Sequence, residues 1–183
     1  MPLTIAIGEL DADLTAIAAL SPSNDDVIQR KTGAWTNRTM AQLAADLVAT
    51  GSLIRKATVT LSSADILALH TTPITLVAAP GAGKWLLVHR TVGVLTYGTT
   101  AYSVADGISP FYDGGGQPLG DLTAMFQASA STVGVSPGAS AYSAPLSSAE
   151  NKAVVLTDGA GDPTLGDSTA TITVWYSVED VPA

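Results

Sequence analysis

The alternation of apolar and polar residues is clearest near the end of the chain. From Ala170 to Val178 every second position is apolar, and threonine, tryptophan or serine occupies the positions between. A period of two is typical of a strand that buries one face. The sequence therefore predicts a strand over 169–178 with one side in a core.

Several local signals agree in the segment 61–98. Ser62 and Asp65 have the spacing of a capping box, and Pro73 ends the short helix that they would begin. An apolar strand over 74–79 and a longer strand over 84–97 follow. Strict alternation along the longer strand places two sets of side chains on opposite faces: Trp85, Leu87, His89, Thr91, Leu95 and Tyr97 on one, and Leu86, Val88, Arg90, Val92 and Val94 on the other. Because both sets are largely apolar, we expect this strand to be covered on both sides, by its own domain or by a second subunit.

The N-terminal region has a helical period. We predict one helix over 9–20 and a second that begins after Thr39, where Gln42 completes a capping box. Each helix has an apolar stripe that needs a partner surface. Together with Trp35, these stripes form the candidate attachment surface: Leu10, Leu14, Ile17, Met40, Leu43 and Leu47.

A β-hairpin is predicted between these helices. The segments 27–31 and 34–38 flank the dipeptide Thr32-Gly33, which is typical of a tight turn. After residue 98 short apolar pieces, such as 122–126 and 153–156, alternate with turns rich in glycine, proline and aspartate. We therefore predict a mainly β protein, with a helix–hairpin–helix arm over 1–56 and a β-sandwich or jelly-roll-like body over 57–183.

Charge and composition limit the class of partner. The chain has 16 acidic and 8 basic residues, a net charge of −8, which argues against binding to nucleic acid or to an anionic membrane surface. It has no cysteine, no run of about 20 apolar residues and no signal-peptide pattern at its start. We expect a protein made in a cytoplasm, without disulfides or thiolate metal sites.

Candidate catalytic and metal-binding patterns are weak. Residues 134–138 match G-x-S-x-G, but Pro137 follows Ser136 and both histidines, His70 and His89, precede it, so a polar loop is the better interpretation. Asp158, Asp162 and Asp167 lie in one acidic loop whose spacing does not fit an EF-hand. We predict no catalytic residues, no cofactor and no metal, and we expect Trp35, Trp85 and Trp175 to pack in a core or a subunit interface.

Two stretches resemble virion structural proteins of tailed bacteriophages. Residues 21–47 contain the pattern D-D-x-x-Q-x-K-x-G-x-W-x-N-R-T followed by a helix, which resembles a module of phage tail-fibre and appendage proteins. Residues 61–84 are similar to an opening found in small phage structural proteins, some of them head-associated. Together the two stretches cover less than half of the chain, and the part after Ser103 carries no resemblance.

The resemblance implies a structural protein of the virion and no enzyme. The first hypothesis is a capsid decoration (cement) protein on the outer surface of the head, a homotrimer whose partners are the major capsid protein and its sister subunits. The alternative is a tail-fibre or receptor-binding appendage whose β-body recognises a bacterial surface glycan. A third and weaker hypothesis is a hydrolase that uses Ser136.

Overall fold

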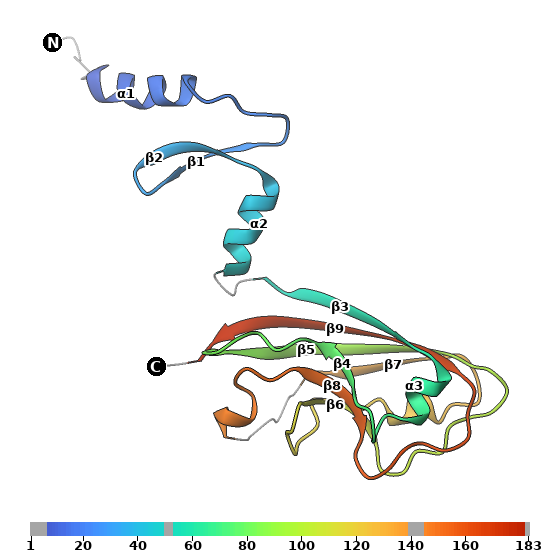
Figure 1. Ribbon diagram of the computed structural model, residues 1–183. Coiled ribbons are helices and arrows are strands. Elements are labelled where there is room, and N and C mark those ends of the chain that lie inside the picture. The colour runs from blue at the N-terminus through green and yellow to red at the C-terminus, as the bar shows by residue number, and fades with distance from the viewer. Residues whose placement is uncertain (1–6, 50–52, 139–144, 182–183) are drawn as a thin grey trace. The chain divides into compact units, whose positions relative to one another are not determined.

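The computed structural model describes residues 7–49, 53–138 and 145–181, and the protein is mainly β, with several antiparallel sheets (Figure 1). The chain divides into two compact units, Met1–Ser52 and Leu53–Ala183. We call them the N-terminal unit and the body. The division falls four residues before the predicted boundary at residue 56, because Arg55 already begins a strand of the body.

The N-terminal unit contains the predicted helix–hairpin–helix order. Its elements are α1 (Ile7–Ala18), β1 (Val27–Lys31), β2 (Ala34–Arg38) and α2 (Met40–Ala49). Both residues of the hairpin turn have positive φ angles, 52° at Thr32 and 86° at Gly33. This is the turn geometry that matches the twist of two antiparallel strands. The capping box before α2 is confirmed by two bonds: the Thr39 N–H donates to Gln42 Oε1 (2.9 Å), and the Gln42 N–H donates to Thr39 Oγ1 (3.2 Å).

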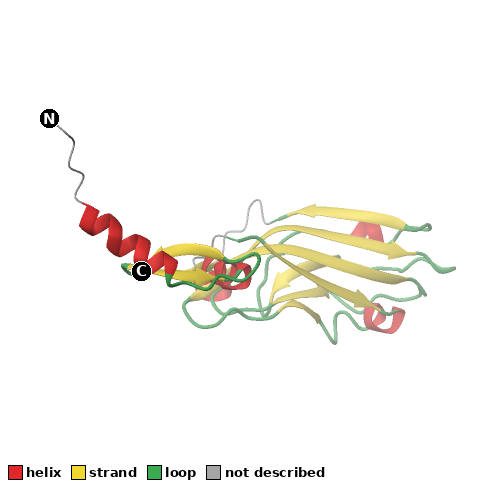
Figure 2. Ribbon diagram, turned by 90° about the horizontal axis from the view of Figure 1, so that it is seen from above, coloured by secondary structure: helices red, strands yellow, loops and turns green. Residues whose placement is uncertain are grey.

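The body is built from two antiparallel sheets. The four-stranded sheet has the order β3-β9-β5-β7, made of β3 (Arg55–Leu61), β9 (Thr169–Asp180), β5 (Lys84–Thr96) and β7 (Thr132–Pro137). The three-stranded sheet has the order β4-β8-β6, made of β4 (Ile74–Val77), β8 (Val154–Asp158) and β6 (Ile108–Tyr112). The connections contain α3 (Ser63–Leu67), α4 (Thr123–Phe126) and the 3₁₀ turn η1 (Leu146–Ser148). Figure 2 shows the long strands of the body side by side.

One hydrophobic core lies between the two sheets of the body. The four-stranded sheet contributes Leu86, Leu95 and Ile172, and the three-stranded sheet contributes Ile108 and Leu156, all of them fully buried. The predicted alternation along the last strand is confirmed from Ala170 to Val174, since Ala170, Ile172 and Val174 are buried on one face of β9, whereas Ser177, expected on the polar face, is also buried. Two sheets that share a core in this way form the predicted sandwich.

A β-bulge in β5 makes the predicted faces of this strand wrong beyond His89. Val88 lies opposite Tyr176, yet Arg90 lies opposite Trp175, so His89 is an extra residue in β5. One inserted residue exchanges the two faces of the strand that follows it. The buried face therefore consists of Leu86, Val88, Thr91, Gly93 and Leu95, and the outer face of Leu87, Arg90, Val92 and Val94.

Among the described residues only one face of β5 is covered by the body itself, so of the two expected covers for the other face, its own domain or a second subunit, the described part of the domain supplies none. On the outer face His89, Arg90, Val94 and Thr96 are exposed. The short apolar piece 122–126, expected among the short strands, folds as the helical turn α4. Five residues are too few for a period to distinguish a strand from a helix.

Candidate functional site

The structure describes six of the seven predicted attachment residues. Leu14, Met40 and Leu47 are 57%, 60% and 49% exposed to solvent, whereas Ile17, Trp35 and Leu43 are half-buried. Leu10 lies in α1, but its side chain is outside the described part. Among the side chains described in this unit none is fully buried. The described side chains of the N-terminal unit therefore form no closed core, and several of them keep apolar surface available for a partner.

Four polar atoms in the hairpin strands are enclosed without a hydrogen-bond partner among the described residues. They are Gln29 Oε1, Trp35 Nε1, Asn37 Oδ1 and Arg38 Nε. All four residues belong to the pattern D-D-x-x-Q-x-K-x-G-x-W-x-N-R-T of residues 25–39. The guanidinium of Arg38 is held elsewhere, since its Nη2 lies 2.6 Å from Asp46 Oδ2. An enclosed polar atom without a partner costs about 1–3 kcal/mol, so this hairpin is incomplete by itself.

A second exposed apolar surface lies on the outer side of the four-stranded sheet. Val92 pairs with Val135 and Val94 pairs with Val133 across β5 and β7, and Val133 and Val135 are 61% and 60% exposed. We call these four residues the valine face. Its neighbours on β9 are Thr171 and Thr173, so no charged side chain stands directly opposite it. Since β7 is an edge strand of this sheet, the valine face adjoins an open row of backbone hydrogen-bonding groups.

The outer face has a different chemistry around Trp175. The Arg90 guanidinium lies 4.1 Å from the centroid of the Trp175 ring, and the Lys56 ammonium lies 5.8 Å from it. These are cation–π contacts. Trp175 therefore packs among cations on the outer face of the sheet, whereas Trp85 packs partly buried against the core.

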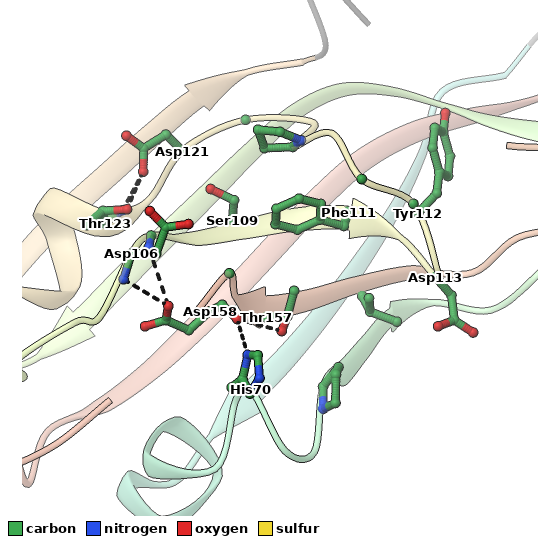
Figure 3. A pocket seen from close by; sticks show the side chains of 18 of the residues that line it. His70, Asp106, Ser109, Phe111, Tyr112, Asp113, Asp121, Thr123, Thr157 and Asp158 are labelled. Carbon is green, nitrogen blue, oxygen red and sulfur yellow. Dashed lines mark hydrogen bonds between the residues drawn. The ribbon is translucent and has the colours of Figure 1, made fainter. Parts of the chain in front are cut away.

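A polar cavity of about 610 Å³ opens in the body, beside β6 and the end of β8 (Figure 3). Segments far apart in the sequence line it, from the 70–73 turn, 106–123 and 155–159. Its lining includes His70, Tyr112 and the four aspartates Asp106, Asp113, Asp121 and Asp158, and neither lysine nor arginine lines it. Six glycines also line it: Gly107, Gly114, Gly115, Gly116, Gly120 and Gly159.

Two of the titratable groups in this cavity serve the fold. The buried carboxylate of Asp158 accepts backbone N–H groups from Ala105 (3.1 Å), Asp106 (3.2 Å) and Gly107 (3.4 Å). The ring nitrogen Nδ1 of His70 lies 2.9 Å from the Asp158 carbonyl oxygen. Asp158 and His70 therefore hold the loops around the cavity in place.

The remaining polar groups of the cavity make few hydrogen bonds to the described residues. Oδ1 of Asp121 accepts the hydroxyl (2.5 Å) and the N–H (2.8 Å) of Thr123. The carboxylates of Asp106 and Asp113 are exposed and accept no hydrogen bond from the described residues. Ser109 is 5% exposed, and its hydroxyl likewise has no partner there. In Figure 3 this hydroxyl points to the side of the cavity where Asp106 and Asp121 lie.

The other two aspartates of the predicted acidic loop anchor neighbouring turns. Asp162 accepts the N–H of His70 (2.8 Å) and both the N–H (2.9 Å) and the hydroxyl (2.6 Å) of Thr71. Asp167 does the same for Thr99 and also accepts the Thr100 N–H. These hydrogen bonds lower the pKa of Asp162 and bring the pKa of Asp167 down to about 2. Within the described residues, no group of three or more aspartates, glutamates or histidines is placed to hold a metal ion.

Ser136 is buried inside β7 and its hydroxyl is already engaged. It accepts the Asp121 N–H (2.9 Å) and lies 3.2 Å from the Pro137 carbonyl oxygen. His89 instead contacts Ser177, with Nε2 3.0 Å from Oγ. A nucleophile elbow needs an exposed serine in a turn, beside a base. Ser136 is neither exposed in a turn nor hydrogen-bonded to a histidine among the described residues.

Comparison with known proteins gives limited information. No family model matches the sequence, and no curated protein matches it. None of the helices in the described part has both the length and the apolar character to span a membrane. Among solved structures, a chain of the cyanophage Pam1 capsid asymmetric unit is similar over 71% of this chain and 84% of its own length, with 14% identity and a TM-score of 0.42.

Proposed function

We propose that this protein is a structural protein of a tailed-bacteriophage virion, and specifically a decoration (cement) protein of the outer head surface. The N-terminal unit attaches the protein to the major capsid protein, and the body contacts sister subunits, as a homotrimer. No catalytic step belongs to this function. The observation that supports it most strongly is the N-terminal unit, which leaves Leu14, Met40 and Leu47 exposed and has no buried side chain among those described.

Attachment to a partner would cover the apolar surface that the N-terminal unit leaves exposed by itself. An apolar partner surface would remove the exposed stripes of α1 and α2 from water, which contributes roughly 25 cal/mol per Å² of apolar area. The phage-like pattern and the unpaired atoms fall on the same hairpin, which supports a role of this hairpin in recognition.

Contacts between sister subunits are assigned to the valine face. It is apolar and free of directly opposed charge, so two copies that each carry a net charge of −8 can approach there with little repulsion. The open edge of β7 adds backbone groups for strand pairing.

The mechanism is thermodynamic. A protein that binds only the assembled lattice stabilises that lattice by RT ln(1 + [L]/Kd) for each site, about 2.7 kcal/mol when the free concentration is 100 times Kd. A shell with many occupied sites then resists heat and internal pressure.

The test uses the full chain and purified particles depleted of it. We expect the wild type to co-sediment with the particles and to raise the temperature at which they release DNA. The variant Leu14→Ser/Met40→Ser/Leu47→Ser should do neither, because its attachment surface is polar. The matched control Leu146→Ser/Leu165→Ser changes equally exposed apolar residues of the body and should behave as the wild type. Equal binding by all three proteins would contradict attachment through the N-terminal unit.

A further inference from the structure

We infer that the polar cavity of the body binds a basic peptide segment, with a lysine or arginine side chain inserted among its aspartates. This binding site is additional to the proposed function and does not depend on it. Four observations support it: the charge of the lining, a serine hydroxyl that opens into the cavity without a hydrogen bond to a described residue, an aromatic wall and a glycine-rich rim.

The charge of the lining selects the sign of the ligand. Asp106, Asp113 and Asp121 line the cavity and have exposed side chains, and neither lysine nor arginine lines it. A concave site with charges of one sign concentrates the opposite charge within it. Phosphates, nucleic acids and acidic sugars are therefore disfavoured, and a cation is attracted.

Ser109 supplies a hydroxyl that opens into the cavity. Its hydroxyl belongs to a residue that is only 5% exposed, lines the cavity and makes no hydrogen bond to a described residue. An ammonium or guanidinium group that reaches the cavity can donate to Ser109 Oγ, while the neighbouring carboxylates accept its other N–H groups.

Phe111 and the glycines shape the site for a peptide. The half-buried Phe111 ring lines the cavity beside Ser109 (Figure 3), and an aromatic wall favours a cation over its face. The consecutive glycines Gly114, Gly115 and Gly116 form the rim without side chains. A peptide backbone can therefore approach closely enough for its side chain to reach Ser109.

A basic segment fits these observations better than a neutral glycan. A sugar could use the same hydroxyl and carboxylate acceptors, and it could stack on Phe111. It would gain nothing, however, from three exposed carboxylates without a compensating cation, and charge-assisted hydrogen bonds are about twice as strong as neutral ones. The excess of negative charge in the lining therefore favours a cationic ligand over a neutral glycan.

The test titrates the full chain with the peptide acetyl-Gly-Arg-Gly-amide, observed by NMR. We expect saturable shifts at Ser109, Phe111 and the glycine rim, and an affinity that falls as salt is added. The matched probe in which citrulline replaces arginine keeps the shape but removes the charge, and it should bind at least about tenfold more weakly.

Variants locate the binding. The double variant Asp106→Asn/Asp113→Asn removes two carboxylates that accept no hydrogen bond from the described residues, so it should fold normally and lose most of the affinity. Ser109→Ala should weaken binding several-fold. The control Asp180→Asn changes an exposed carboxylate outside the cavity and should leave the affinity unchanged.

Four results would overturn the inference. They are equal binding of the citrulline probe, equal weakening by Asp180→Asn, no shifts at millimolar peptide, and saturable binding of the neutral trisaccharide of N-acetylglucosamine at Ser109 in the absence of arginine binding. Unchanged spectra of the variants outside the cavity would show that loss of binding is not loss of folding.

Discussion

At the scale of single residues, aspartates hold the loops of the body. Asp158, Asp162 and Asp167 each accept at least two backbone N–H groups from a segment more than fifty residues away in the sequence. Each carboxylate thus replaces hydrogen bonds that a loop cannot make with a regular strand. Composition suggested only an acidic surface, whereas these three charges are structural.

Asp167 makes the free energy of unfolding depend on pH in the acidic range. Its pKa is about 2 in the folded protein against an ordinary value of 3.8, so the charged form is favoured by folding. Its contribution is fully present above pH 3.8 and is lost as the pH falls toward 2. The free energy of unfolding, measured by denaturant titration at a series of pH values, should fall more steeply below about pH 4 in the wild type than in Asp167→Asn.

The control for this acid dependence is Asp180→Asn, which alters an aspartate whose side chain is 79% exposed. Its pH profile should parallel that of the wild type. If Asp167→Asn also parallels the wild type, the hydrogen bonds to Thr99 and Thr100 do not stabilise the fold through the charge of Asp167.

Ser136 provides a second test at this scale. Replacing it by alanine removes the acceptor of the Asp121 N–H, so Ser136→Ala should lower the free energy of unfolding by about 1–3 kcal/mol. The hydrolase hypothesis instead requires this variant to abolish a hydrolytic activity. Any activity in the preparation that persists in Ser136→Ala removes that hypothesis.

At the scale of elements, α4 packs where two strands have no side chains. Gly93 of β5 pairs with Gly134 of β7, and Met125 of α4 covers both. A Cβ atom added at Gly93 would meet the flexible end of Met125, with Sδ at 2.5 Å and Cε at 2.8 Å. A Cβ atom at Gly134 would meet the Met125 Cβ at 2.9 Å, close to the helix backbone.

These contacts predict different responses to the same substitution. Gly93→Ala and Gly134→Ala should each destabilise the body by about 1–3 kcal/mol because the space is occupied. In a Met125→Ala background, Gly93→Ala should lose most of its penalty, since the two Met125 atoms are gone and only Ile172 Cδ1, at 3.1 Å, remains close. Gly134→Ala should remain destabilising there, because the Cβ atom of residue 125 is still present. Denaturant unfolding of the six proteins measures this, and equal rescue at both glycines would contradict the packing.

Sequence patterns predicted the elements well where the signal is local. Both capping boxes, the hairpin and the last strand depend on residues within a few positions of one another. The bulge at His89 could not be predicted, because one extra residue is visible only from the partner strand β9. The valine face was missed for that reason, since it exists only after the faces exchange and β5 pairs with β7.

The cavity was beyond sequence reasoning for a different reason. Its lining comes from the 70–73 turn, 106–123 and 155–159, which the sheet order brings together. Asp158 was noticed as part of an acidic loop, and its partners across the fold were not predictable. Ser109 gave no signal, because an isolated serine in an apolar stretch becomes informative only when its burial and lack of a partner are known.

At the scale of the whole molecule, the valine face predicts self-association of the body. The full chain should form oligomers whose size depends on concentration, measured by light scattering after size-exclusion chromatography. Val133→Lys/Val135→Lys should give monomers with little change in stability, within about 0.5 kcal/mol, because both side chains are exposed in the single chain. Leu165→Lys, at another exposed apolar position, should leave the oligomer intact. Wild-type monomers at all concentrations would contradict this use of the valine face.

Copy number in the particle tests the proposed role most directly. Quantitative mass spectrometry of purified virions should give this protein and the major capsid protein in a ratio near one or a simple fraction of one, as a component of the whole shell requires. A ratio of a few per cent or less would contradict decoration and favour the tail-fibre alternative. Absence from the particle would contradict a virion role altogether.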